Sequence, residues 1–228
     1  MASTFPNIAS TIKGEAGIIE LRAHVPVGVA PRAVAVVAHP HPLFGGTMDN
    51  KVVTTIARAF FDADCATFRF NFRGVGASEG VHDDGRGETT DMLAVVRHAR
   101  AQMQSLYPSL PPLPLWLAGF SFGGAVALAA SEYVEATEMV LVAPAFERLS
   151  HWKNAQTGVQ MVSNPPETTI IIHGEKDETV PLADSLDWAR PRNIPVVVVP
   201  NADHFFHLRL HIIKRLVSRL AVGAKVST

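Results

Sequence analysis

The segment that decides the fold runs from Leu113 to Ala130 and reads LPLWLAGFSFGGAVALAA. An apolar run stops at Gly119, a single hydroxyl follows at Ser121, and an alanine-rich segment begins after Gly123. A G-x-S-x-G pattern between a buried strand and a helix is typical of a nucleophile elbow, a sharp strained turn with no room for side chains two residues before and after the serine. The pattern therefore predicts a nucleophile at Ser121. The alternative is a serine that only caps the following helix.

Short runs rich in valine and isoleucine alternate with helical patterns along the chain, which is typical of βαβ units and a parallel sheet. A turn at residues 14–17 also predicts an antiparallel hairpin within Ser10–Val25. The 228 residues, 47% of them hydrophobic, are expected to form one α/β domain, residues 1–228, with about eight mostly parallel strands and helices on both faces. The other expected strands are Arg32–Ala38, Ala66–Phe72, Leu113–Ala118, Glu138–Ala143, Thr168–His173 and Ile194–Val199.

Five helices are expected between these strands. The first follows a cap at Asp49 or Asn50, and the last has an apolar face that begins at Phe205. Only about 20 residues, from Phe146 to Glu167, separate the expected strands Glu138–Ala143 and Thr168–His173, which is too few for a multi-helix lid. The other three expected helices are Glu88–Met103, Ser121–Ser131 and Leu182–Arg190. The apolar face of the C-terminal helix comprises Phe205, Leu208, Ile212, Ile213 and Leu216.

The overall charge and the single cysteine narrow the choice of partners. Twenty basic and 21 acidic residues give a net charge of -1, which argues against binding to nucleic acid or an anionic membrane. Cys65 alone cannot form an internal disulfide or a cysteine-built zinc site. The sequence begins without a typical signal peptide and has no apolar run of about 20 residues. We therefore expect a soluble cytoplasmic protein that acts on a small molecule, with its oligomeric state left open.

A serine hydroxyl needs a base and an orienting carboxylate, which in this strand–turn–helix class follow in the order Ser, Asp or Glu, His. The segment from His173 to Pro181 reads HGEKDETVP, and Asn201 to Phe206 reads NADHFF. Asp177 and His204 are therefore the expected acid and base. The alternatives are Glu175 and Glu178 for the acid, and His207 and His211 for the base.

The loop His39–Thr47, HPHPLFGGT, follows an expected strand and can help to stabilise an oxyanion. In acyl transfer on this type of elbow, one N–H comes from the residue after the nucleophile, here Phe122, and another from this loop. The two prolines of the loop have no N–H, which leaves His41 and Leu43, and we favour Leu43. The alternative is a rigid loop that only packs against the sheet.

Four segments together resemble the α/β-hydrolase superfamily: GFSFGG, HGEKDETVP, ADHFF and HPHPLFGGTMDNKVV. The last of these, together with FRFNFRGVGASEG, resembles its small, lid-free bacterial serine hydrolases, and the likeness extends from about Ile18 to the end. The resemblance implies the fold, the triad Ser121, Asp177 and His204, and no cofactor. It does not imply a substrate, because this fold supports many chemistries.

The expected function is cleavage of a small carboxylic ester through an acyl-enzyme on Ser121. Thioesters, lactones and amides would use the same groups, and a non-catalytic binding protein is the remaining alternative. We expect Leu43, Phe44, Phe122, Phe146 and Trp152 to wall the substrate site. A nucleotide is not expected, because Arg73–Gly80 lacks the G-x-G-x-x-G spacing, and no metal is expected, because no H-E-x-x-H pattern accompanies the histidines.

Overall fold

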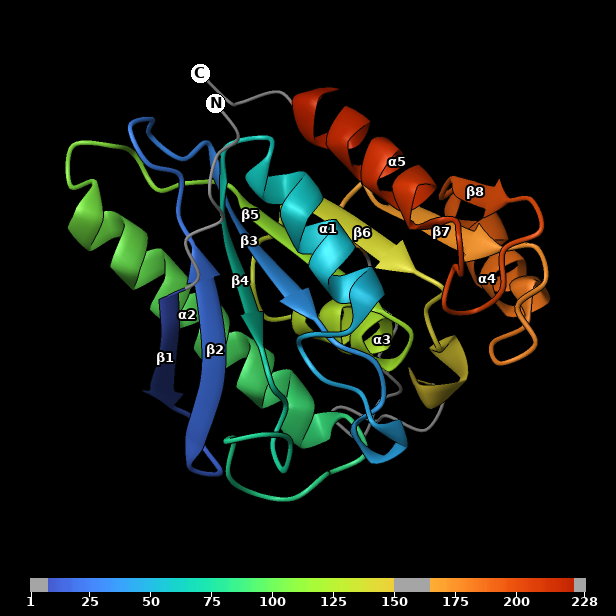
Figure 1. Cartoon of the computed structure of the whole chain (residues 1–228), viewed down its shortest axis with the longest axis horizontal. Helices are drawn as coiled ribbons and strands as arrows, with labels where there is room; N and C mark the ends of the chain where they lie inside the picture. Colours follow the sequence, from blue (N-terminus) through green and yellow to red (C-terminus); the bar gives the residue numbers. More distant parts are fainter. Residues whose placement is uncertain (1–7, 150–164, 224–228) are drawn as a thin grey trace.

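Eight strands form one sheet in the spatial order β1-β2-β4-β3-β5-β6-β7-β8 (Figure 1). The computed structural model describes residues 8–149 and 165–223. Strands β3 to β8 run parallel to one another, whereas β2 is antiparallel to both of its neighbours, β1 and β4. The predicted mostly parallel α/β fold is therefore confirmed. The strands are β1 (Ile8–Lys13), β2 (Ile18–His24), β3 (Ala33–Ala38), β4 (Cys65–Phe70), β5 (Leu115–Phe120), β6 (Glu138–Val142), β7 (Ile170–Gly174) and β8 (Val196–Val199).

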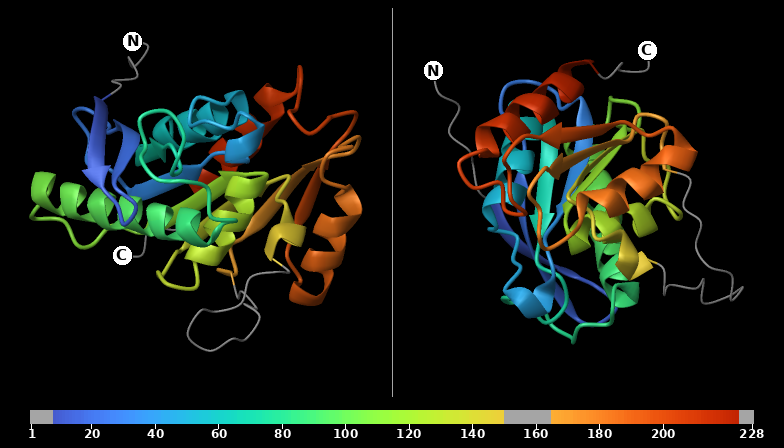
Figure 2. Two further views of the ribbon diagram at one scale, coloured as in Figure 1. Left: turned by 90° about the horizontal axis from the view of Figure 1, so that it is seen from below. Right: turned by 90° about the vertical axis from the view of Figure 1, so that its right-hand side faces the viewer.

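Helices cover both faces of the sheet (Figure 2). Helices α1 and α5 pack over one face, where Ile56 and Ile213 join the same buried cluster. Helices α2, α3 and α4 cover the other face, with Met92, Val126 and Ala189 in a second cluster. The helices are α1 (Lys51–Phe61), α2 (Arg86–Leu106), α3 (Phe122–Ala130), α4 (Leu182–Ala189) and α5 (Leu210–Gly223), and the short 3-10 turns are η1 (Pro42–Phe44), η2 (Phe146–Leu149) and η3 (Arg190–Arg192).

The central strands are buried on both faces, which explains their continuous apolar sequences. All six residues of β3 are buried, and they alternate between the two clusters. Strand β5 runs two residues further than predicted, because Gly119 still pairs with Ala38 of β3 and with Leu141 of β6. The sheet therefore continues up to the residue before Ser121.

The final helix begins later than the sequence pattern predicts. Helix α5 starts at Leu210, and Phe205 and Leu208 are exposed rather than part of its buried face. Phe206 and Leu208 have positive φ values of 53° and 59°, which a helix cannot contain. The apolar spacing is misleading here because residues 201–209 form a loop, in which His204 contacts Ser121.

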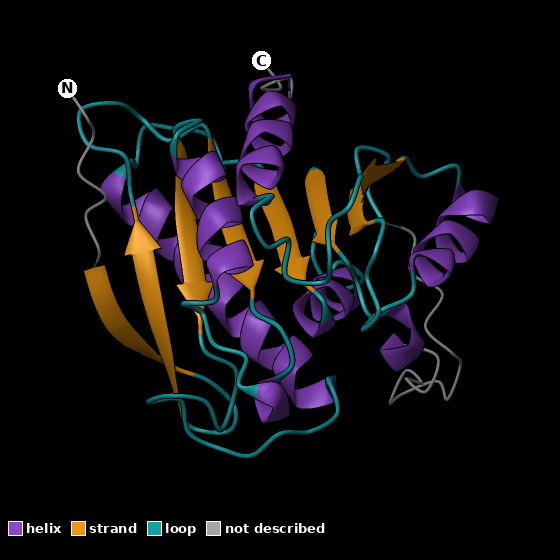
Figure 3. Ribbon diagram, turned by 45° about the vertical axis from the view of Figure 1, so that its right-hand side comes forward, coloured by secondary structure: helices purple, strands orange, loops and turns teal. Residues whose placement is uncertain are grey.

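The parallel strands end at one edge of the sheet, and the loops that follow them gather there (Figure 3). Between β6 and β7, the only element in the described residues is the turn η2. Trp152 and most of the Phe146–Glu167 segment lie outside the described residues. Within the described part of the chain, no helix is both long and apolar enough to cross a bilayer.

Candidate active site

Ser121 occupies the turn between β5 and α3 with a strained backbone, φ 55° and ψ −119°. Its N–H donates to the carbonyl of Val142 at 2.9 Å, which ties the turn to the neighbouring strand. The side chain makes no capping hydrogen bond to α3. The geometry is that of a nucleophile elbow, and it does not support the helix-cap alternative.

Two glycines make this turn sterically feasible. A Cβ on Gly119 would collide with the carbonyl of Gly123, as the sequence pattern predicts. A Cβ on Gly123 would instead collide with the carbonyls of Ala38 and His39, at the end of β3. Glycine is required at both positions, but at Gly123 the constraint comes from a neighbouring strand.

The structure brings the three predicted residues Ser121, Asp177 and His204 together from the loops after β5, β7 and β8. His204 Nε2 lies 3.1 Å from Ser121 Oγ, and His204 Nδ1 lies 2.7 Å from Asp177 Oδ2. All three residues are buried. Because a carboxylate only accepts, Nδ1 carries the proton and Nε2 is left to accept the serine O–H.

Further hydrogen bonds hold the Asp177 carboxylate in place. Its Oδ1 accepts the N–H groups of Thr179 at 2.9 Å and Val180 at 2.8 Å. Burial alone would raise the pKa of Asp177, but hydrogen bonds from His173, His204 and the Val180 N–H outweigh burial and lower the pKa. Asp177 is therefore ionised at neutral pH and can stabilise a protonated His204.

The alternative acids and bases have other contacts. Glu175 accepts the N–H of Asn201 at 2.8 Å, and Glu178 is exposed. His207 lies on the loop before α5 and pairs with Asp203 at 2.6 Å, whereas His211 is an exposed residue of α5. The geometry favours Asp177 and His204 over all four.

The loop after β3 contains the candidate donors to an oxyanion. Phe122 follows the serine and begins α3. The N–H of Leu43 donates to His41 Nδ1 at 3.3 Å, and the Leu43 side chain points to solvent, 69% exposed. The Leu43 N–H thus has an acceptor within its own turn. Leu43 stays the favoured donor of the sequence analysis, with His41 as the alternative.

His39 anchors this loop, a role that the sequence analysis missed. Its Nδ1 lies 2.6 Å from the carbonyl of Pro40, so Nδ1 carries the proton, and Nε2 accepts the N–H of Phe72 at 3.0 Å. Burial lowers the pKa of His39 to about 4, despite the bond to Pro40, which acts in the opposite direction. A neutral imidazole therefore joins the loop to the chain just after β4.

A crevice of about 160 Å³ opens beside Ser121. Of the expected wall residues, Phe44, Phe122 and Phe146 line it, whereas Leu43 does not and Trp152 lies outside the described residues. Two carboxylates that the sequence analysis missed also face the crevice, those of Glu147 and Asp184. Among the described residues, the lining comprises His41, Phe44, Ser121, Phe122, Ala145, Phe146, Glu147, Thr179, Val180, Pro181 and Asp184.

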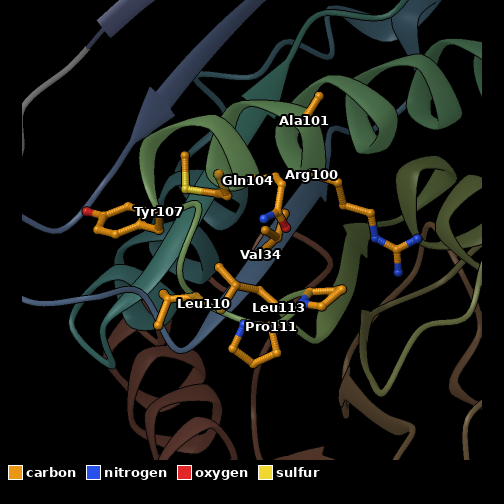
Figure 4. Close-up of a pocket in the computed structure, with 10 residues that line it drawn as sticks. Val34, Arg100, Ala101, Gln104, Tyr107, Leu110, Pro111 and Leu113 are labelled. Carbon is orange, nitrogen blue, oxygen red and sulfur yellow. The ribbon is translucent and has the colours of Figure 1, made fainter.

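A larger hollow of about 270 Å³ lies between the end of α2 and the proline-rich loop before β5 (Figure 4). It adjoins Val34 at the start of β3, and thus lies at the edge of the sheet opposite Ser121. Arg100, Gln104 and Tyr107 supply its polar groups, and none of the described residues that line it is a serine, cysteine or histidine. The described lining therefore offers no nucleophile with a base.

Cys65 is fully buried at the start of β4. Burial raises the pKa of its thiol to about 12, so almost no thiolate forms at neutral pH. In the ranges 8–149 and 165–223, no group of histidine, cysteine and carboxylate side chains is arranged to hold a metal ion. Ser121 is thus the nucleophile that the described site offers.

Comparisons with known proteins define the family. Residues 30–164, more than half of the chain, match the family model described as serine aminopeptidase, S33. The structure resembles XC6422 from Xanthomonas campestris, an α/β serine hydrolase without lid, with 32% identity over 97% of this chain and 98% of that one and a TM-score of 0.83. The chain therefore belongs to the α/β serine hydrolase superfamily.

Two further relatives also match most of the chain. An α/β serine hydrolase homologue from Coxiella burnetii is 34% identical over 96% of this chain and 99% of that chain, with a TM-score of 0.78. An uncharacterized protein of Rickettsia prowazekii is 28% identical over 184 residues, which cover 77% of this chain and 73% of the relative. These matches define the fold and the family and leave the substrate open.

Proposed function

We propose that this protein hydrolyses a small carboxylic ester through an acyl-enzyme on Ser121. The observation that carries the proposal is the continuous hydrogen-bonded series from Asp177 through His204 to Ser121, located beside an accessible crevice. Nucleophile, base and orienting carboxylate are all within the distances that this chemistry requires.

In the first step, His204 Nε2 takes the proton of Ser121 as Oγ attacks the ester carbonyl. The carbonyl oxygen becomes an oxyanion, held by the N–H of Phe122 and by one N–H from the loop after β3, that of Leu43 or that of His41. The N-terminus of α3 adds a favourable dipole at this position. Asp177 stabilises the imidazolium that forms on His204.

In the second step, His204 returns this proton to the leaving alcohol as the bond between the carbonyl carbon and the alkoxy oxygen breaks. Water then attacks the acyl-enzyme, His204 takes the water proton, and the Ser121 Oγ–acyl bond breaks as that proton passes back to Oγ. The products are one alcohol and one carboxylic acid. Thioesters, lactones and activated amides could react in the same way, and among them we favour esters.

A panel of p-nitrophenyl esters tests this proposal. We expect turnover to be highest for acetate and butyrate and to fall from hexanoate to decanoate, because the crevice is small and open. Rates should rise hyperbolically with concentration, without a jump where the ester exceeds its solubility. Folded protein that hydrolyses no member of the panel would contradict the proposal, and a preference for decanoate would contradict the small site.

The charge of the crevice predicts a substrate preference. Glu147 and Asp184 line it, whereas no lysine or arginine is among the lining residues in the described part of the chain. Burial raises the pKa of Asp184, and the negative charge of Glu147 raises it further. We expect kcat/KM to be about tenfold higher for an ester whose acyl chain ends in trimethylammonium than for one ending in a carboxylate.

The E147Q/D184N double variant should remove most of this preference and leave an uncharged ester of equal length unaffected. The matched control is D187N on the same helix, because Asp187 pairs with Arg190 at 2.7 Å and does not line the crevice. Equal rates for the two charged esters in the wild-type protein would show that the carboxylates do not act on the substrate.

A further inference from the structure

His173 is a second histidine in contact with Asp177, besides His204. It lies within β7 and is fully buried. Its Nε2 lies 2.9 Å from the carbonyl oxygen of Val180 and 3.4 Å from Asp177 Oδ2. Its Nδ1 lies 2.8 Å from the hydroxyl oxygen of Ser185, a buried residue of α4. No step of the proposed mechanism uses this imidazole.

The partners of the ring determine its tautomer. The Val180 carbonyl and the Asp177 carboxylate only accept, so Nε2 carries a proton. In the neutral ring Nδ1 then accepts the Ser185 O–H, and this hydrogen bond keeps the proton on Nε2. Ser185 on α4 therefore orients the ring, and the ring directs its N–H toward Asp177 and Val180.

The same contacts fix the Asp177 carboxylate. Oδ2 contacts both His204 and His173, while Oδ1 accepts the N–H of Val180. His173 also binds the carbonyl of Val180, so that residue is held through both its N–H and its carbonyl. Rotation of the carboxylate away from His204 would break several of these hydrogen bonds at once.

We propose that His173, oriented by Ser185, is a positioning residue that holds the Asp177 carboxylate in the orientation His204 needs for catalysis. This inference rests on the proposed function. His173 and Ser185 extend the hydrogen-bonded series of Ser121, His204 and Asp177. They also connect it to α4, whose first turn contains the crevice residue Asp184.

The electrostatic effect has a definite direction. The hydrogen bond from His173 helps to lower the pKa of Asp177 against the effect of burial. Without it the carboxylate is more basic and attracts the imidazolium form of His204 more strongly. The acid limb of the kcat/KM profile should then move to higher pH. The other ionisable groups near this pair are His204, which is hydrogen-bonded to Asp177, and Asp184, which precedes Ser185 on α4.

The test compares H173F, H173Q and S185A on an uncharged short-chain ester. H173F keeps an aromatic ring but has no hydrogen-bond donor, and we expect its kcat to fall about 10²-fold, as for misplaced catalytic groups. Its KM should stay within about twofold of the wild-type value, and the acid limb of its kcat/KM profile should move to higher pH. H173Q, whose amide can still donate, should recover about tenfold of this loss. S185A should shift the limb in the same direction by a smaller amount.

The outcomes distinguish positioning from packing. The inference would be overturned if H173F kept the wild-type kcat and an unchanged acid limb of the kcat/KM profile. It would also be overturned if H173F lost kcat without a shift of the acid limb and H173Q recovered none of that loss. If circular dichroism shows that H173F is not folded, the shift of the acid limb in H173Q and S185A tests the inference instead. Failure of the wild-type protein to hydrolyse any ester would instead reject the proposed function.

Discussion

Replacing Ser121 with alanine will abolish both ester hydrolysis and covalent labelling by a serine-directed phosphonate. The hydroxyl is the atom that forms the acyl-enzyme, and Ser121 Oγ lies 3.1 Å from His204 Nε2. Loss of a serine nucleophile reduces kcat by about 10⁶-fold in a serine protease. Intact-protein mass spectrometry should show one adduct on the wild-type protein and none on S121A.

The matched control is S131A, at the other end of α3. The Ser131 hydroxyl donates to the carbonyl of Leu128 at 2.7 Å, so this variant loses a hydroxyl from the same helix without touching the crevice. S131A should label and turn over as the wild type does. An adduct on S121A, or no adduct on folded wild-type protein, would exclude Ser121 as the nucleophile.

The elbow could be predicted from the sequence because its determinants are local. A buried strand, two glycines and a helix within Leu113–Ala130 leave few conformations for Ser121. The acid and base could be placed because the ends of parallel strands meet at one edge of the sheet, so the residues after β7 and β8 lie near that serine. Chain order then favoured Asp177 and His204, which the structure brings into contact.

Other features depend on contacts between distant segments and left no local signal. The partner of His39 is Phe72, 33 residues away, and the crevice carboxylates come from η2 and α4. The motif HGEKDETVP contains His173, but its role depends on Ser185, which α4 brings back to the strand. The apolar spacing predicts a final helix that begins near Phe205, because spacing alone does not reveal the positive φ of Phe206 and Leu208.

Replacing Asp177 with asparagine should leave the fold intact and reduce kcat by about 10⁴-fold, the effect of the equivalent change in a serine protease. An amide at this position can turn its NH₂ toward His204 and select the tautomer that cannot accept the proton of Ser121. It also cannot stabilise an imidazolium. The rate should be measured as kcat on a short p-nitrophenyl ester, with circular dichroism to establish folding.

Glu175 and Glu178 on the same loop provide isosteric controls, as E175Q and E178Q. The Glu175 carboxylate accepts the N–H of Asn201, and Glu178 is exposed, so neither should change kcat by more than about twofold. Phosphonate labelling of D177N should be slow rather than absent, because Ser121 remains while its base is held in the wrong tautomer. Wild-type turnover in D177N together with a large loss in either control would transfer the role of the acid to that glutamate.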